Sequence, residues 1–246
     1  MKKVAVAFSG GMDSTVMLHM AADQYDQVYA LIFDYGQRHS IELECASKQL
    51  CDLRQKHPDK KIESKVIDVR FLREIAPTSS LTNDDIDTPS VKDMRGEAQP
   101  LSYVPNRNMM FLSILASYAE ANDVDTIWYG AALVDSLAGY WDGSAEFLPA
   151  INNLLALNRE KTVKVEAPLI EMSKEQIILN GICHEVDFAK TWTCYSAGPL
   201  ADADSASSSM RLQGFINCGH RDPLAYHQQD KLNAIYDHKG CTHIEY

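Results

Sequence analysis

The stretch KKVAVAFSGGMDST, residues 2–15, decides the fold of this 246-residue chain. Its first half is a short, continuous apolar run, which is typical of a strand covered on both faces in a parallel sheet. The run stops at Gly10 and Gly11, and from residue 13 to 22 apolar residues recur at helical spacing. A second apolar run at 28–33 completes a strand, turn, helix and strand. This order predicts an α/β fold, a Rossmann-like parallel sheet with helices on both faces.

The alternation continues along the chain. We expect further helices over about 41–55, 108–122 and 145–157, and further strands at 65–69, 126–130 and 163–167. After Ser173 the sequence predicts a helix, an irregular stretch rich in Ser and Ala, and a final helix near 223–238. Without repeats or a linker, residues 1–246 are expected to form one domain with a C-terminal helical extension from about residue 192.

One polar stretch interrupts this pattern. Residues 78–100 are rich in Thr, Ser, Asn, Asp and Pro. Compact domains seldom leave more than about 12–15 residues without regular structure unless the segment has a purpose. We therefore predict a mobile loop or lid here.

Charge and composition exclude several functions. The chain has 23 Lys and Arg against 34 Asp and Glu, a net charge of −11, so its surface repels phosphate backbones and offers no polybasic patch. No apolar run approaches the roughly 18 residues that span a bilayer. The 6 cysteines include no C-x-x-C pair, and a chain of this size needs no disulfides. We expect a cytoplasmic protein that binds a small molecule or a protein partner, and neither nucleic acid nor membrane.

The loop after the first strand carries the strongest chemical signal. Gly10 and Gly11 let the backbone approach a polyanion, and the following helix start directs N–H groups and partial positive charge at it. A plain glycine turn would explain either glycine, but not the hydroxyls and the carboxylate around them. The sequence has neither the Walker pattern nor the G-x-G-x-x-G pattern of dinucleotide folds. The loop is therefore predicted to hold a phosphate chain.

The pattern S-G-G-x-D-S resembles the pyrophosphate loop of ATP pyrophosphatases, which cleave ATP between the α and β phosphates to adenylate a substrate. Synthetases of GMP, NAD and asparagine and some tRNA-modifying enzymes share this motif, so it names a reaction class without a substrate. The resemblance implies ATP and Mg²⁺ as cofactors. It also implies a nucleotide loop made of Phe8, Ser9, Gly10, Gly11, Met12, Asp13, Ser14 and Thr15.

Further segments resemble the QueC family, the 7-cyano-7-deazaguanine synthases, over nearly the full length. They are DYGQRH at 34–39, VPNRN at 104–108, YWD at 140–142, TWTCY at 191–195 and GHRDP at 219–223. The resemblance implies that Asp34 and Gln37 lie near the nucleotide and that Asp13, Arg107 and Lys174 are catalytic, the two cations also binding the polyphosphate. It implies a substrate-binding group of Tyr140, Trp141, Asp142, Glu146 and Phe147.

Each of these residues also has a plainer interpretation. Asp34 could be a turn residue, Arg107 a surface ion-pair partner, and Lys174 an exposed lysine in a first helical turn. Asp142 and Glu146 could be solvated at a helix start. Trp141 and Phe147 could be core aromatics.

The family's reaction would activate the carboxylate of 7-carboxy-7-deazaguanine as an acyl adenylate. Ammonia would then form an amide, which is activated again and dehydrated to a nitrile. No side-chain nucleophile is needed, so Cys194 is not assigned as a covalent catalyst. Two alternatives stay open, namely conjugation of the base to a protein amine, as in QueC-like proteins of anti-phage operons, and nucleotide binding without catalysis. A homodimer is expected.

The chain departs from the family in two places. The family holds a structural zinc with four cysteines, but here Asp202, Ser205 and Ser208 stand where three of them belong, and only Cys194 remains. We predict no metal site of this kind, because hydroxyls replace thiolates poorly at zinc. The alternative is a rebuilt site of Cys194 with Cys218, His220, Cys241 or His243. The stretches 130–133 and 140–144 also differ from the family pattern, which indicates an altered base pocket.

Overall fold

A computed structural model describes residues 1–36, 41–83, 85–86, 100–194 and 199–245. In this part of the chain a 5-stranded parallel sheet has the order β3-β2-β1-β4-β5. The strands are β1 Lys3–Ala7, β2 Gln27–Asp34, β3 Lys61–Asp68, β4 Thr126–Trp128 and β5 Lys164–Glu166. The predicted α/β fold with a parallel sheet is confirmed.

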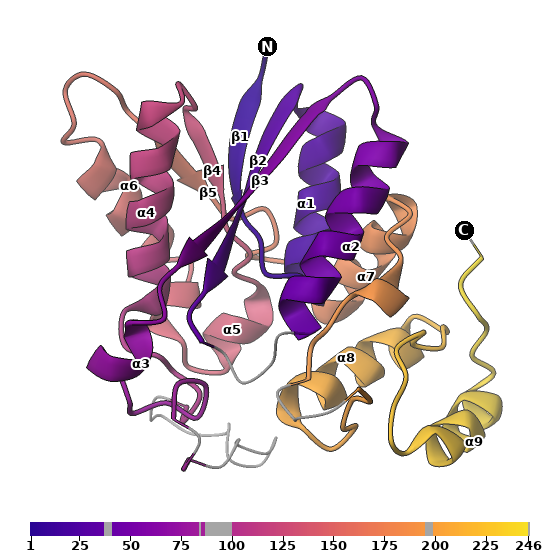
Figure 1. Cartoon of the computed structure of the whole chain (residues 1–246). Coiled ribbons are helices and arrows are strands. Elements are labelled where there is room, and N and C mark those ends of the chain that lie inside the picture. The colour runs from indigo at the N-terminus through magenta and orange to yellow at the C-terminus, as the bar shows by residue number, and fades with distance from the viewer. Residues whose placement is uncertain (37–40, 84, 87–99, 195–198, 246) are drawn as a thin grey trace.

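Helices cover both faces of the sheet (Figure 1). One face packs against α1 Met12–Gln24, α2 Ile41–Lys56 and α7 Lys174–Cys183, and the other against α4 Arg107–Ala121 and α6 Phe147–Leu155. Successive strand residues alternate between the two cores: Val4 and Val6 belong to the first, and Ala5 to the second. Burial on both faces explains the continuous apolar runs of β1 and β2.

The C-terminal extension forms a third packed region. Helices α8 Ala206–Asn217 and α9 Gln229–Lys239 lie beyond α7, toward the end of the molecule to which the strand arrows point (Figure 1). Their apolar residues pack with Trp192 and Cys194, and with Cys45 of α2. The shorter elements are the helices α3 Leu72–Ile75 and α5 Leu133–Leu137 and the 3₁₀ turns η1 Trp141–Gly143 and η2 Phe188–Lys190.

Three elements differ most from the sequence predictions. Strand β3 begins at Lys61 rather than Lys65, because it is an edge strand whose first residues are mostly polar and only partly covered. The stretch predicted to be irregular contains α8, which the Ser205 side chain caps and which buries Leu212 and Phe215. The last helix starts at Gln229 rather than near residue 223.

Other predictions stay untested. Most of the predicted mobile loop, namely residue 84 and residues 87–99, lies outside the described residues. The single-domain organisation, the homodimer and the cytoplasmic location also remain predictions. Among the described residues, no helix combines the length and the apolar character needed to cross a membrane.

Candidate functional site

The strand order itself locates the candidate site. The chain runs outward from β1 to β3 on one side and then crosses to β4 and β5 on the other, so the order reverses between β1 and β4. Ligands of open parallel sheets bind at the carboxyl ends of the strands at such a reversal. A cavity of about 300 Å³ lies there, and its wall includes Ser9 to Ser14 after β1, apart from Gly10, and Gly130 and Ala131 after β4.

Gly10 lets the loop after β1 pack directly against α2. Its φ is +85°, and a Cβ placed on it would lie 2.3 Å from the Glu42 carbonyl oxygen and 2.7 Å from the Ala46 backbone nitrogen. Both neighbours are backbone atoms and cannot swing aside. Only glycine fits this position.

The loop is closed by its own hydroxyl groups. The Ser9 and Ser14 Oγ atoms lie 3.0 Å apart, the Gly11 N–H donates to Ser9 Oγ at 3.1 Å, and Thr15 Oγ1 donates to the Gly11 carbonyl at 2.8 Å. Gly11 is the N-cap of α1 and supplies no side-chain cap, so the first N–H groups of the helix have no side-chain acceptor from it. Ser9 and Ser14 line the cavity, while Thr15 is buried behind them. Such a helix start favours an anion.

Lys174 brings a cation to this loop. Its Nζ lies 2.7 Å and 3.0 Å from the two carboxylate oxygens of Asp13, and its side chain is only 11% exposed. Ser173 and Gln176 form a capping box that begins α7 at Lys174 and so fixes the lysine backbone. Lys174 itself is not part of the cavity wall and contacts it through Asp13.

Arg107 enters the cavity from the opposite face of the sheet. It is the first residue of α4 and follows Asn106, whose left-handed backbone (φ 55°) turns the chain into the helix. The guanidinium carbon lies 5.5 Å from the ring centre of Tyr35, and both residues line the cavity. Burial raises the pKa of the Tyr35 phenol to about 12, so this ring stays neutral. Asp13, Lys174 and Arg107, predicted as catalytic, therefore lie around one end of the strands.

Asp135 is a residue that the sequence analysis missed. It lines the cavity from the first turn of α5, and its Oδ2 accepts a hydrogen bond from the Ala132 N–H at 2.8 Å. Burial and, to a smaller extent, the charge of Asp13 raise the pKa of its carboxyl group to about 6, against the opposing effects of the Ala132 N–H, Lys174 and Arg107. An acidic residue just after a strand end was the available signal, but no motif singled it out.

Aromatic rings supply flat walls. Phe33 of β2 and Phe111 of α4 stack with centres 4.0 Å apart and an interplanar angle of 5°, and both line the cavity. Tyr129, Tyr140 and Trp192 add further ring surface. Planar apolar walls beside a few polar groups are typical of small-molecule pockets and suit a nucleobase.

Several predicted residues lie away from the cavity wall. Asp34 accepts the Gly36 N–H at 3.0 Å and has Arg70 Nε at 3.9 Å.

Of the predicted base-binding group, only Tyr140 lines the cavity. Phe147 and Asp142 are buried elsewhere, and Glu146 is exposed. Trp141 is 39% exposed and donates from Nε1 to the Tyr103 hydroxyl at 2.7 Å. Gln37 lies outside the described residues. The binding roles of all these residues stay predictions.

The four positions of the family's zinc cluster lie together but do not suit zinc. The Cys194 sulfur accepts the Asp202 N–H at 3.2 Å and lies 3.8 Å from Ser205 Oγ, which donates to Ser208 Oγ at 2.9 Å. The Asp202 carboxylate accepts Gln228 Nε2 at 3.1 Å. One thiol and two hydroxyls already bonded to each other do not form the soft donor set that zinc needs.

Two of the four alternative donors, Cys218 and Cys241, lie against other partners. The Cys218 and Cys241 thiols point at the Glu175 and Ile216 carbonyl oxygens, at 3.6 Å and 4.0 Å. No group of three or more His, Cys, Asp or Glu side chains suited to a metal occurs in the described part of the chain. The absence of zinc stays a prediction.

A parallel sheet whose first strand ends in S-G-G-x-D-S at the reversal point is the arrangement of ATP-using pyrophosphate-loop proteins. The chain belongs to the QueC family: residues 3–219 match the model of "Queuosine biosynthesis protein QueC". It is 37% identical over 225 residues to 7-cyano-7-deazaguanine synthase 1 of Colwellia psychrerythraea, covering 92% of this chain and 99% of the relative. The synthase of Marinobacter nauticus is 38% identical over 223 residues, covering 91% and 96%.

Solved structures give a weaker likeness. NMN synthetase from Francisella tularensis matches 96% of this chain and 86% of its own at 15% identity, with a TM-score of 0.48. The family assignment rests on the sequence matches alone.

Proposed function

We propose that this chain uses ATP to convert 7-carboxy-7-deazaguanine into the corresponding nitrile. A carboxylate oxygen attacks the α-phosphorus of ATP, the bond to the β-phosphate oxygen breaks, and pyrophosphate leaves. Ammonia attacks the acyl carbon and AMP departs with the carboxylate oxygen, which gives the amide. A second ATP adenylates the amide oxygen, and loss of AMP and the remaining N–H protons gives the nitrile. Two ATP are consumed per nitrile.

The observation that carries this proposal is the closed glycine loop on the wall of the cavity. Its helix start and the hydroxyls of Ser9 and Ser14 suit the β and γ phosphates. Lys174 and Arg107 would balance the negative charge that builds on the transferring phosphate, which is the main task of a protein in such a reaction. Magnesium supplies further charge neutralisation when it is bound with ATP, and the carboxylates of Asp13 and Glu42 line the cavity where they would hold it.

The names of the relatives support this choice of substrate. Relatives that align over more than nine-tenths of this chain are named 7-cyano-7-deazaguanine synthases. The aromatic wall of Phe111 and Tyr140 and the carboxylate of Asp135 offer stacking surface and hydrogen-bond acceptors to a guanine-like base, whose edge carries N–H donors.

The proposal is tested by incubating the protein with ATP, Mg²⁺ and 7-carboxy-7-deazaguanine, with and without ammonium, and following products by mass spectrometry. We expect AMP, pyrophosphate and nitrile when ammonium is present. Lys174→Met should abolish most AMP formation. Lys161→Met is the matched control, because Lys161 pairs with Asp123 on the exposed surface. Nucleotide hydrolysis to ADP, or no change in the base, would refute the proposal.

The same assay identifies the acceptor. If a protein amine rather than ammonia takes the activated carboxylate, a polypeptide in the mixture gains the mass of the acylated base. In that case the protein amine, rather than ammonia, is the acceptor of the acyl group, and the proposed adenylation of the carboxylate is unchanged.

A further inference from the structure

A segment of the C-terminal extension touches the nucleotide loop directly. The Trp192 N–H donates to the Gly10 carbonyl at 3.2 Å, and a Cβ on Gly11 would lie 3.4 Å from the Trp192 carbonyl oxygen. Trp192 and Thr193 also line the cavity. The position of this segment therefore bears on the position of the loop.

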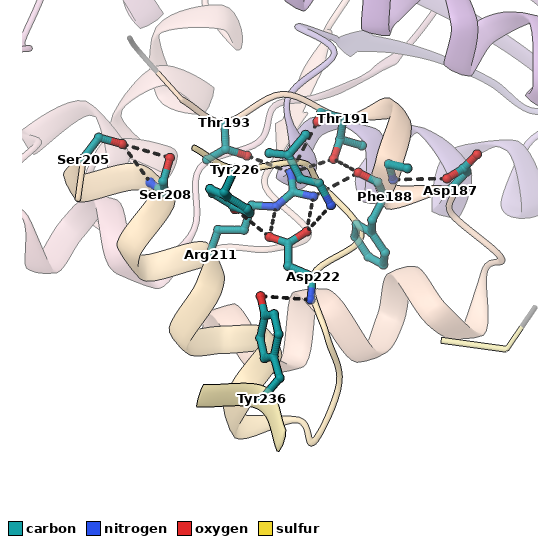
Figure 2. A network of polar contacts seen from close by, with 12 residues as sticks. Asp187, Phe188, Thr191, Thr193, Ser205, Ser208, Arg211, Asp222, Tyr226 and Tyr236 are labelled. Atoms are coloured by element: carbon teal, nitrogen blue, oxygen red, sulfur yellow. Dashed lines mark hydrogen bonds and ion pairs between the residues drawn. The ribbon is translucent and has the colours of Figure 1, made fainter. Parts of the chain in front are cut away.

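One arginine holds this segment in place. Arg211 of α8 is fully buried, and its Nη1 donates to Thr191 Oγ1 at 2.7 Å and to Thr193 Oγ1 at 3.2 Å. Its Nη2 donates to the Phe188 carbonyl at 2.9 Å. Figure 2 shows the guanidinium between these acceptors and a carboxylate. The fork of one side chain thus spans the chain from Phe188 to Thr193.

Asp222 fixes the arginine from the other side. Its oxygens accept Arg211 Nε at 2.7 Å and Nη2 at 2.9 Å and the Tyr226 hydroxyl at 2.8 Å (Figure 2). They also accept the Leu224 N–H at 3.0 Å. Both side chains of the ion pair are 0% exposed. The carboxylate is thereby held by two further groups of the extension, the Tyr226 hydroxyl and the Leu224 N–H, and in turn orients the guanidinium.

Stability alone does not account for such a pair. Desolvation offsets most of the attraction within a buried ion pair, and apolar residues of similar volume often stabilise a core as well or better. What a planar, bidentate fork adds is a defined geometry. Here the acceptors of the guanidinium lie in the segment that contacts Gly10 and Gly11, so the defined geometry fixes the position of that segment.

We propose that Arg211, oriented by Asp222, is a positioning residue for the ATP site: it sets the Thr191–Cys194 segment and, through Trp192, the nucleotide loop. The inference rests on ATP binding at this loop, as in the proposed function, but not on the identity of the base or of the acceptor. Arg211 and Asp222 line no part of the cavity and act through the backbone they hold.

The test measures ATP affinity in the variants Arg211→Lys, Asp222→Asn and Thr191→Val. Isothermal titration with ATP and Mg²⁺ at 15 °C gives Kd, and AMP release gives KM and kcat. We expect Kd and KM for ATP to rise about tenfold in Arg211→Lys and Asp222→Asn and about fivefold in Thr191→Val, as for typical coupling between sites. Thr191 is fully buried and outside the cavity wall, so it cannot contact the nucleotide.

Asp237→Asn is the matched control. Asp237 pairs with Arg221 in the same extension, but it is 68% exposed and remote from the segment. It should leave Kd unchanged. An irreversibly misfolded fraction lowers the binding amplitude and kcat without moving Kd or KM, whereas reversible unfolding raises the apparent Kd by the inverse of the folded fraction. Kd is therefore compared only among variants that circular dichroism shows to be folded at 15 °C, which separates positioning from folding. Thr191→Val decides the question if the ion-pair variants do not fold.

Three results would overturn the inference: wild-type Kd in Thr191→Val, an equal effect of Asp237→Asn and Asp222→Asn, or a wild-type protein that does not bind ATP. A protein that binds ATP but does not turn over the deazaguanine acid refutes the proposed function only. The variants would then still report on the positioning role through Kd.

Discussion

Replacing Gly10 by alanine tests the packing of the nucleotide loop. The residue has φ +85°, and its Cβ would lie 2.3 Å from the Glu42 carbonyl oxygen and 2.7 Å from the Ala46 nitrogen. The left-handed conformation costs an alanine about 1–2 kcal/mol, and overpacking against backbone adds about 1–3 kcal/mol. For a chain of this size, the resulting 2–5 kcal/mol lowers the midpoint of thermal unfolding by roughly 4–20 °C.

Gly219 provides the matched control. Its φ is +76°, but a Cβ there would meet nothing within 4 Å, so alanine suffers only the conformational strain. Circular dichroism melts should place the midpoint of Gly10→Ala below that of Gly219→Ala by roughly 2–12 °C. ATP affinity should fall in Gly10→Ala alone, because the loop must move away from α2. Equal midpoints for the two variants would refute the close packing of this loop against α2.

The remaining predictions concern the cavity charges and the metal. Lys174→Met removes the cation beside Asp13, and AMP formation should fall by about 100-fold with little change in unfolding midpoint; an unchanged kcat/KM would contradict this role. Because burial raises the pKa of folded Asp135 to about 6, the folded state holds this proton more tightly, and the contribution of this carboxyl group to stability falls as pH rises from about 4 to 6, by about 3 kcal/mol. The unfolding midpoint of Asp135→Asn should therefore rise relative to that of the wild type over this pH interval. A difference in midpoint that does not change with pH would contradict the raised pKa. Elemental analysis should find no stoichiometric zinc, and a chelator should leave the midpoint unchanged; one zinc per chain would contradict the predicted absence of a zinc site.

The sheet and the nucleotide loop were predictable because their signals are local. The apolar run of β1, the glycine pair and the helical spacing of α1 lie within one continuous stretch, 3–24. Each strand buried on both faces carries its own continuous apolar run. Edge strand β3, with one covered residue among polar neighbours, lacks this signal and was found only in part.

The missed features depend on distant contacts. Helix α8 contains Ala-Ser-Ser-Ser, whose serines favour caps and turns over helix interiors, and it forms around Arg211 and Phe215, which find their partners elsewhere in the chain. Asp135 owes its raised pKa to burial in a wall assembled from three strand ends, those of β1, β2 and β4. Periodicity in one sequence cannot report such an assembly.

The central claim is that the loop after β1 holds ATP while the α-phosphorus is transferred to a carboxylate. Supplying 7-carboxy-7-deazaguanine labelled with ¹⁸O in both carboxylate oxygens, with ATP, Mg²⁺ and ammonium, tests it most directly. The account predicts that both labelled oxygens appear in AMP, one in each of two molecules, and none in pyrophosphate. Unlabelled AMP, or ADP in its place, would contradict it.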